Sequence, residues 1–391
     1  MKLIVRLNLT FLTLVLIAFS ALAQTAKPAE KPPEKPLDKK AGLTAAEFSK
    51  LSRDLSEEGG YFRSENFTSN ETPYLHVVDK LKELGATGGA YLGVGPEQNY
   101  TYIAKIRPQI AFLLDIRRQA IIQHLMYKAV FHHSPTRAQF LAMLFSRPLA
   151  KDKTFAADAP IADLVAYFSS AAADEKTYAA NLALIRKTIQ EDFQFPLSEA
   201  DQKSLEHVYQ TFRDEGLDIS YQVGQFRGGN FPVLKDLILQ TDLNGKLGNY
   251  LARVEDFEFM RGMHEKNLII PVVGNFAGRT AIAAVGDYLK KNGLTVTAFY
   301  LSNVEQYLFM DQLFADFANN VKKLPITDKS LMIRSASGRG ASHPARQAGH
   351  RSATLLMKIS VFIKDFDEEK FKTYNDLLLT DYIAAEKPEV K

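Results

Sequence analysis

Cysteine is absent from this chain of 391 residues, and its absence limits how the protein can be held together. No disulfide can form, so even in an oxidising compartment the folded part depends on its hydrophobic core alone. The chain can supply such a core, because 46% of its residues are hydrophobic. The length suits one large domain or two ordinary ones.

A large net charge is also lacking. The formal charge of the whole chain is only +3. Lys2 and Arg6 contribute +2 within residues 1–23, and five lysines against three acidic residues contribute another +2 within residues 24–41. The part from Gly42 onward is therefore close to −1. We expect no nucleic-acid partner, because this part has no domain-wide basic field.

Several motifs of catalytic sites are missing as well. The sequence has no H-E-x-x-H pair, no G-x-S-x-G elbow and no P-loop. His132 and His133 end an expected helix, where the helix dipole favours a cationic ring, and His124 stands alone. We therefore expect no metal ion, since no spacing typical of zinc ligands occurs.

The N-terminus has the pattern of an export signal. A charged start is followed by an apolar run over residues 7–18, and Ala-Leu-Ala at residues 21–23 presents small residues to a signal peptidase. We predict a signal peptide over residues 1–23, cleaved after Ala23, and an exported protein that is periplasmic or secreted. A membrane anchor over residues 3–23 is the alternative, because the apolar span approaches the ~20 residues that cross a bilayer. No cysteine follows that could carry a lipid.

Residues 24–41 predict a disordered tether. They hold four prolines and alternating charges, so they cannot bury a core. The tether separates the signal from a folded domain over residues 42–391, and a membrane is expected as a partner only through an uncleaved signal. Within the domain, residues 57–72 are polar and contain glycine, which indicates a loop.

Buried strands and helices alternate over residues 90–131. Residues 90–94 and 110–114 are short apolar runs typical of buried strands. Helices are expected after Pro96, which suits a first helical position, and over residues 117–131. Continuous apolar strands separated by helices indicate a parallel sheet with both faces covered.

Later segments predict a helical insertion and then more α/β structure. Residues 136–215 have helical spacing throughout, so an insertion of three or four helices is expected there, followed by a short strand over residues 217–223. We expect further strands over residues 267–273, 295–301, 331–334 and 353–362, and helices over residues 280–291, 304–321 and 368–385.

A glycine turn lies between the first strand and the first helix. Gly93 and Gly95 let the backbone turn tightly, and the amides of residues 96–98 lie at the positive end of the helix. Asp115 lies 20 residues after Gly95, at the end of the next strand, where an acid can accept hydrogen bonds from ribose hydroxyls. This order of strand, glycine turn, helix, strand and acid is typical of a nucleotide-binding unit.

The glycine motif is incomplete. A dinucleotide fingerprint has a third glycine where this chain has Gln98, and a methyltransferase-type G-x-G-x-G has one where it has Glu97. Glu97 disfavours NAD or FAD, because it places negative charge where a pyrophosphate would lie. A plain turn in which Glu97 complements the helix dipole is the alternative. One of Arg117 and Arg118 could pair with Asp115 or bind an anionic substrate, but the favoured expectation is that both lie in solvent at the start of their helix.

Three segments resemble a known group of proteins: GAYLGVGPEQNYTYIAKIRPQIAFLLDIRR, VVGNFAG and FYLSNVEQYLF. Together they are similar to an uncharacterised family of exported bacterial proteins, over roughly residues 45–380. The resemblance implies a Rossmann-like core similar to S-adenosylmethionine-dependent methyltransferases. It also implies that Gly93, Gly95 and Asp115 line a cofactor cleft, and that the parallel sheet ends in an antiparallel hairpin.

Polar residues follow two later strands. Asn275 follows one strand, and Ser302 and Glu305 follow the next. Because ligands gather at the carboxyl ends of parallel strands, these side chains are expected on one rim with Gly93 and Asp115. For Ser302, the favoured alternative is capping of its helix, with Glu305 completing a capping box.

Two functions stay open at this point. The first is a methyltransferase-like enzyme that binds S-adenosylmethionine or another nucleoside ligand and acts by proximity and alignment. The second is a non-catalytic binding or scaffold protein of the cell envelope that keeps the fold without the cofactor. Export favours the second, because S-adenosylmethionine is made in the cytoplasm. The candidate cofactor-binding residues are Gly93, Gly95, Glu97, Asp115, Asn275, Ser302 and Glu305.

Overall fold

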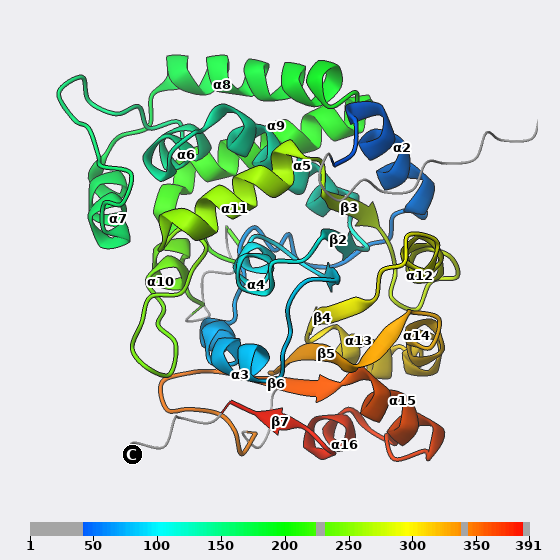
Figure 1. Cartoon of the computed structure of the whole chain (residues 1–391). Coiled ribbons are helices and arrows are strands. Elements are labelled where there is room, and N and C mark those ends of the chain that lie inside the picture. The colour runs from blue at the N-terminus through cyan, green and yellow to red at the C-terminus, as the bar shows by residue number, and fades with distance from the viewer. Residues whose placement is uncertain (1–41, 224–230, 338–342, 386–391) are drawn as a thin grey trace, which may run out of the picture. The chain divides into compact units, whose positions relative to one another are not determined.

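The computed structural model describes residues 42–223, 231–337 and 343–385 (Figure 1). The signal peptide and the tether predicted for residues 1–41 lie outside the described residues, so both stay predictions. Within the described ranges, none of the helices combines the length and the apolar character needed to cross a membrane.

A seven-stranded mixed sheet runs through this part of the chain. Its strands are β1 Ala90–Gly93, β2 Ile110–Asp115, β3 Ile269–Val273, β4 Val296–Ser302, β5 Ile326–Ala336, β6 Ala353–Lys358 and β7 Ile383–Ala384. They lie in the order β3-β2-β1-β4-β5-β6-β7. Strands β1 to β5 are parallel, whereas β6 and β7 are each antiparallel to the preceding strand. The predicted Rossmann-like α/β class with an antiparallel ending is confirmed.

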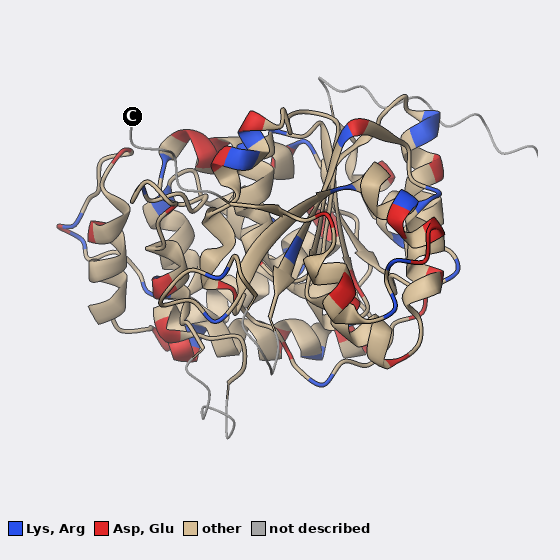
Figure 2. Ribbon diagram, turned by 90° about the horizontal axis from the view of Figure 1, so that it is seen from below, with Lys and Arg blue, Asp and Glu red and all other residues tan. Residues whose placement is uncertain are grey.

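Helices cover the sheet, and three of its strands, including the edge strand β3, are buried along their whole length. Every residue of β1, β2 and β3 is buried, as their continuous apolar sequences predict. The helices outside the long β2–β3 connection are α2 Ala45–Leu55, α3 Val78–Glu83, α4 Gln98–Ile106, α12 Ala281–Lys291, α13 Val304–Met310, α14 Phe314–Val321, α15 Ile359–Asp367 and α16 Tyr374–Leu379. Figure 2 shows Lys and Arg interspersed with Asp and Glu along the outer helices.

The helical region predicted over residues 136–215 is present between β2 and β3. This connection contains α5 Arg118–His133, α6 Arg137–Leu144, α7 Ile161–Ser170, α8 Glu175–Lys187, α9 Glu199–Glu215, α10 Leu234–Ile238 and α11 Val254–Glu265. Figure 1 shows α5, α8, α9 and α11 close together in the upper part of the view. The strand expected over residues 217–223 is wrong, because the stretch begins in a 3-10 helix, η3 (Gly216–Asp218), and then forms an isolated bridge from Ser220 to Val233.

Three predictions near the C-terminus are also wrong in their bounds. The helix expected over residues 304–321 is two helices, α13 and α14, and between them Gln312 has a left-handed φ of 59°. Residues 359–362 were expected in a strand but begin α15. The closing helix expected over residues 368–385 is only α16, followed by the edge strand β7. Short apolar runs fit either a strand or a buried helix, and tertiary packing decides between them.

Residues 56–72 cross the carboxyl edge of the sheet, and we call them the roof segment. The backbone N–H of Glu57 donates to the carbonyl of Val273 at 2.9 Å, and that of Gly60 donates to Ile116 at 2.8 Å. These bonds fix the roof segment to the ends of β3 and β2. A stretch that the sequence predicts only as a loop is therefore held against the carboxyl edge of the sheet.

Candidate ligand cavity at the carboxyl edge of the sheet

A cavity of about 220 Å³ lies beneath the roof segment. Its wall is formed by that segment, by α13 and by the turns that follow β1, β2, β3 and β4. Because the chain passes from β1 to β2 on one side and returns to β4 on the other, the cavity spans the topological switch point of the sheet. Open α/β sheets bind ligands at this position. Four of the residues expected at a ligand site line the cavity, namely Gly95, Asp115, Asn275 and Ser302.

Gly95 forms the wall after β1. Its φ of +80° is in the left-handed region that favours glycine, and a Cβ placed on it would meet no atom within 4 Å. Gly93 has a different reason to be glycine, because a Cβ there would lie 2.0 Å from Oδ1 of Asn99. Gly93 therefore allows close packing beneath the turn, and Gly95 shapes the cavity wall.

Two side chains hold the glycine turn, and neither was identified from the sequence. Nδ2 of Asn99 lies 2.9, 3.1 and 2.8 Å from the carbonyl oxygens of residues 94–96. Nε2 of His124 donates to the carbonyl of Gly95 at 3.0 Å, while its Nδ1 accepts from the Tyr100 hydroxyl at 2.9 Å. Burial lowers the pKa of His124 to about 4, so the ring is neutral and its Nδ1 can accept from Tyr100. Hydrogen bonds from Asn99 and His124 therefore fix the conformation of the glycine turn.

Glu97 lies below the turn and is not among the described residues that line the cavity. The residue is 3% exposed, and its buried Oε2 has no hydrogen-bond partner. Burial raises the pKa of Glu97 to about 7, against the opposing effect of hydrogen bonds from its own backbone N–H and that of Ser69. The bond from Ser69 links this buried acid to the roof segment.

Asp115 ends β2 and is paired with Arg117. Oδ1 of Asp115 accepts from the backbone N of Arg117 at 2.9 Å and from its Nε at 3.0 Å, and Oδ2 accepts from Nη2 at 2.6 Å. Both side chains are buried, so the expectation of a solvated Arg117 is wrong. Arg117 also donates to the carbonyls of Ser64 and Glu65, which ties the roof segment to β2. Oδ2 of Asp115 has one such donor and can accept another hydrogen bond from a ligand.

Asn275 lies in the loop that joins β3 to α12. Its Oδ1 accepts from the backbone N of Ala277 at 3.0 Å, which closes a tight turn at the cavity wall. The start of α12 is capped by Glu57 of the roof segment, whose Oε1 accepts from the backbone N of Thr280 at 2.7 Å and of Ala281 at 2.6 Å. Burial raises the pKa of Glu57, but these hydrogen bonds outweigh it and lower the pKa below its ordinary value.

Ser302 ends β4 with a left-handed φ of 51° and lines the cavity. It does not cap α13, because that helix has no side-chain cap; its hydroxyl donates to Oε1 of Glu71 instead. Glu71 is 2% exposed. Burial raises its pKa, opposed by hydrogen bonds from Ser302, Tyr300 and Gln98. A buried acid, which the sequence did not single out, therefore lies directly behind a cavity hydroxyl.

Glu305 forms an ion pair with Arg334 of β5. Oε2 of Glu305 lies 2.9 Å from Nε of Arg334, and Oε1 lies 3.0 Å from Nη2. The two side chains are 1% and 0% exposed. Glu305 does not line the cavity among the described residues, and the capping box expected with Ser302 is absent there.

Uncharged polar and aromatic side chains dominate the rest of the wall. The roof segment contributes Asn66, Thr68, Ser69 and Asn70, and the aromatic rings come from Tyr61, Phe62, Tyr221, Phe276, Tyr300 and Tyr307. Among the described lining residues, the charged side chains are Asp115, Arg117 and Asp311. Rings suit stacking or the attraction of a cation, and amides and hydroxyls suit hydrogen bonds to a neutral polar ligand.

These features define an α/β protein with a cavity at the switch point of a seven-stranded sheet. Residues 66–389 match a domain family of unknown function (DUF7790). The chain therefore belongs to this family, in agreement with the expected resemblance to uncharacterised proteins. The matched part begins inside the roof segment and includes the strand ends that form the cavity. No curated protein matches the chain.

Proposed function

We propose that this protein binds a small nucleoside-type ligand without phosphate groups, with S-adenosylmethionine as the first candidate, and that it is methyltransferase-like if it is catalytic. The observation that carries the proposal is the combination of the Gly95 turn and Asp115 in one cavity at the switch point. Small-molecule sites typically have volumes of about 300–1,000 Å³. A cavity of about 220 Å³ favours a compact ligand over a dinucleotide.

The charges on the wall support a ligand without phosphates. Arg117 is the one cation among the described residues of the wall, and Asp115 already neutralises it. A phosphate group would therefore meet no unpaired Lys or Arg among these residues, whereas phosphate sites usually provide one. A nucleoside with a cationic sulfonium centre suits a wall of aromatic rings near Asp311.

Each wall element has a role in this proposal. The free acceptor position on Oδ2 of Asp115 would take a ribose hydroxyl. The rings of Phe62 and Tyr307, whose centroids are 5.1 Å apart in an edge-to-face arrangement, would pack against the base or the sulfonium group. Methyl transfer would then depend on aligning an acceptor with the methyl group rather than on a charged catalytic residue.

Calorimetric titration of the purified protein with S-adenosylmethionine and S-adenosylhomocysteine tests the proposal. We expect binding of one molecule per chain, weakened several-fold by Tyr307→Ala because one aromatic contact contributes about 0.5–1.5 kcal/mol. Met310→Ala is the matched control, since Met310 is on the same helix, is 69% exposed and does not line the cavity. Absence of heat with both compounds would reject S-adenosylmethionine as the ligand.

A non-catalytic protein of the cell envelope is the second candidate. It is favoured by the predicted signal over residues 1–23, because export would separate the protein from cytoplasmic S-adenosylmethionine. The replacement of the third motif glycine by Glu97 or Gln98 supports it too. Binding of a nucleoside without methyl transfer to any acceptor, together with recovery of the processed protein outside the cytoplasm, would favour this candidate over the enzyme.

A further inference from the structure

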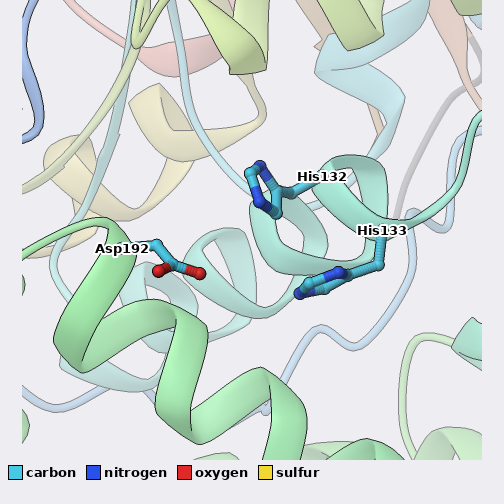
Figure 3. A group of neighbouring side chains, drawn as sticks. All are labelled: His132, His133 and Asp192. Atoms are coloured by element: carbon cyan, nitrogen blue, oxygen red, sulfur yellow. The ribbon is translucent and has the colours of Figure 1, made fainter.

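His132, His133 and Asp192 come together at the end of α5 (Figure 3), and none of them lines the cavity. The two histidines occupy the last turn of α5, and Asp192 ends a π-helical turn, η2 (Thr188–Asp192). One ligand atom of each side chain lies within 4.8 Å of the others. Figure 3 shows the Asp192 carboxylate directed toward the two imidazole rings. The sequence indicated only two adjacent histidines, because the carboxylate arrives from another segment.

His133 already has the hydrogen bond that a metal-ligating histidine needs. Its Nε2 lies 2.7 Å from Oγ1 of Thr188, a buried hydroxyl in the first position of η2. If Nε2 carries the proton and donates it to this hydroxyl, Nδ1 is left with a free lone pair. Ligating histidines are usually oriented by such a second bond.

The electrostatic surroundings favour a cation. The carbonyl end of α5 is the negative end of the helix dipole, and Asp192 adds a carboxylate beside it. The His132 ring also packs against the ring of Phe193 in an edge-to-face arrangement, with ring centroids 5.7 Å apart. The site thus has two nitrogen ligands, one oxygen ligand and an apolar neighbour.

We propose that His132, His133 and Asp192 bind one divalent transition-metal ion, with Zn²⁺ as the preferred ion and water in the remaining position. Two imidazoles and one carboxylate form a ligand set that suits zinc. Tetrahedral zinc with bonds of about 2.0–2.2 Å holds its ligand atoms about 3.3–3.6 Å apart, so ligand atoms near the 4.8 Å limit would move closer by about 1.2–1.5 Å. His132 and Asp192 are exposed and free to make this movement. The ion joins the end of α5 to η2.

The test uses the full chain without a histidine tag, titrated with Zn²⁺ in a calorimeter and with Co²⁺ by visible absorption. We expect one ion per chain. His132→Ala and Asp192→Asn, both at exposed positions, are each expected to weaken binding by at least tenfold, since even an outer partner of a ligand is worth roughly 10–100-fold. Zn²⁺ is also expected to raise the midpoint of thermal unfolding of the unmodified protein more than that of the variants.

His207→Ala is the matched control. His207 is an exposed histidine in α9, and its Nε2 lies 2.6 Å from Oε1 of Glu65, but no second histidine is grouped with it among the described residues. This variant is expected to keep the full affinity. The proposal is overturned if no saturable Zn²⁺ binding occurs, if His132→Ala and Asp192→Asn bind as tightly as the unmodified protein, or if His207→Ala weakens binding equally. Circular dichroism of each variant separates loss of ligands from loss of folding.

Discussion

Replacement of Arg334 by methionine is expected to destabilise the protein by about 3–5 kcal/mol, the usual cost of leaving a buried charge without its partner. Arg334 is 0% exposed and Glu305 is 1% exposed, so water cannot replace the two contacts of 2.9 and 3.0 Å that join them. Burial already raises the pKa of Glu305, and Arg334 opposes that effect. Without Arg334, the carboxyl group must take up a proton or stay charged in an apolar site.

Urea unfolding followed by circular dichroism at neutral pH measures this loss. A cost of about 3–5 kcal/mol is a large share of the about 5–15 kcal/mol that stabilises a typical domain, so the midpoint should fall clearly. The double variant Glu305→Leu with Arg334→Met should recover most of the stability, because no charge is then buried. Lys203→Ala is the control, since its ion pair with Glu199 has side chains that are 74% and 85% exposed and should contribute less than about 1 kcal/mol.

Arg334→Met and Glu305→Gln together decide whether Glu305 belongs to a ligand site or to the framework. A loss of less than about 1 kcal/mol in the free energy of unfolding of Arg334→Met would contradict a stabilising role of the buried ion pair, since leaving a buried charge without its partner usually costs about 3–5 kcal/mol. Loss of ligand binding in Glu305→Gln at an unchanged urea midpoint would contradict the framework role. This second result would place Glu305 in contact with the ligand, as its sequence position alone suggested.

Two further predictions concern the glycine turn and the acid below it. The pKa of Glu97 is about 7 in the folded protein, against an ordinary value of 4.5. The folded state therefore binds the carboxyl proton more tightly than the unfolded state does. The protonated carboxyl group contributes to the stability of the fold below pH 4.5, and this contribution is lost as the pH rises through about 7. Between pH 5 and pH 8 this loss is about 2.5 kcal/mol of unfolding free energy, and Glu97→Gln should remove it; an unchanged difference between the two pH values would contradict the prediction. Gly95→Ala should cost about 1–2 kcal/mol through its left-handed φ. Gly93→Ala should cost more, because its Cβ would lie 2.0 Å from Oδ1 of Asn99, and equal urea midpoints would disprove this ranking.

Local sequence patterns were sufficient for most of the sheet and for part of the cavity. The apolar runs of β1 to β4 and the helices between them follow from side-chain periodicity, which is a property of neighbouring residues. Gly95 and Asp115 were found because a turn and a strand end have local signatures. Where a short apolar run fitted either a helix or a strand, as at residues 359–362, the prediction was wrong.

The other half of the site depends on segments that are far apart in the chain. Glu57 caps a helix 223 residues later, and Glu71 accepts the hydroxyl of Ser302 across 231 residues. No periodicity or spacing connects such pairs, because the contact exists only when the roof segment crosses the completed sheet. The sequence by itself determined which segments become strands and where the backbone turns. Only the tertiary structure decided which side chains meet, because burial and strand order bring together residues that are distant in the chain.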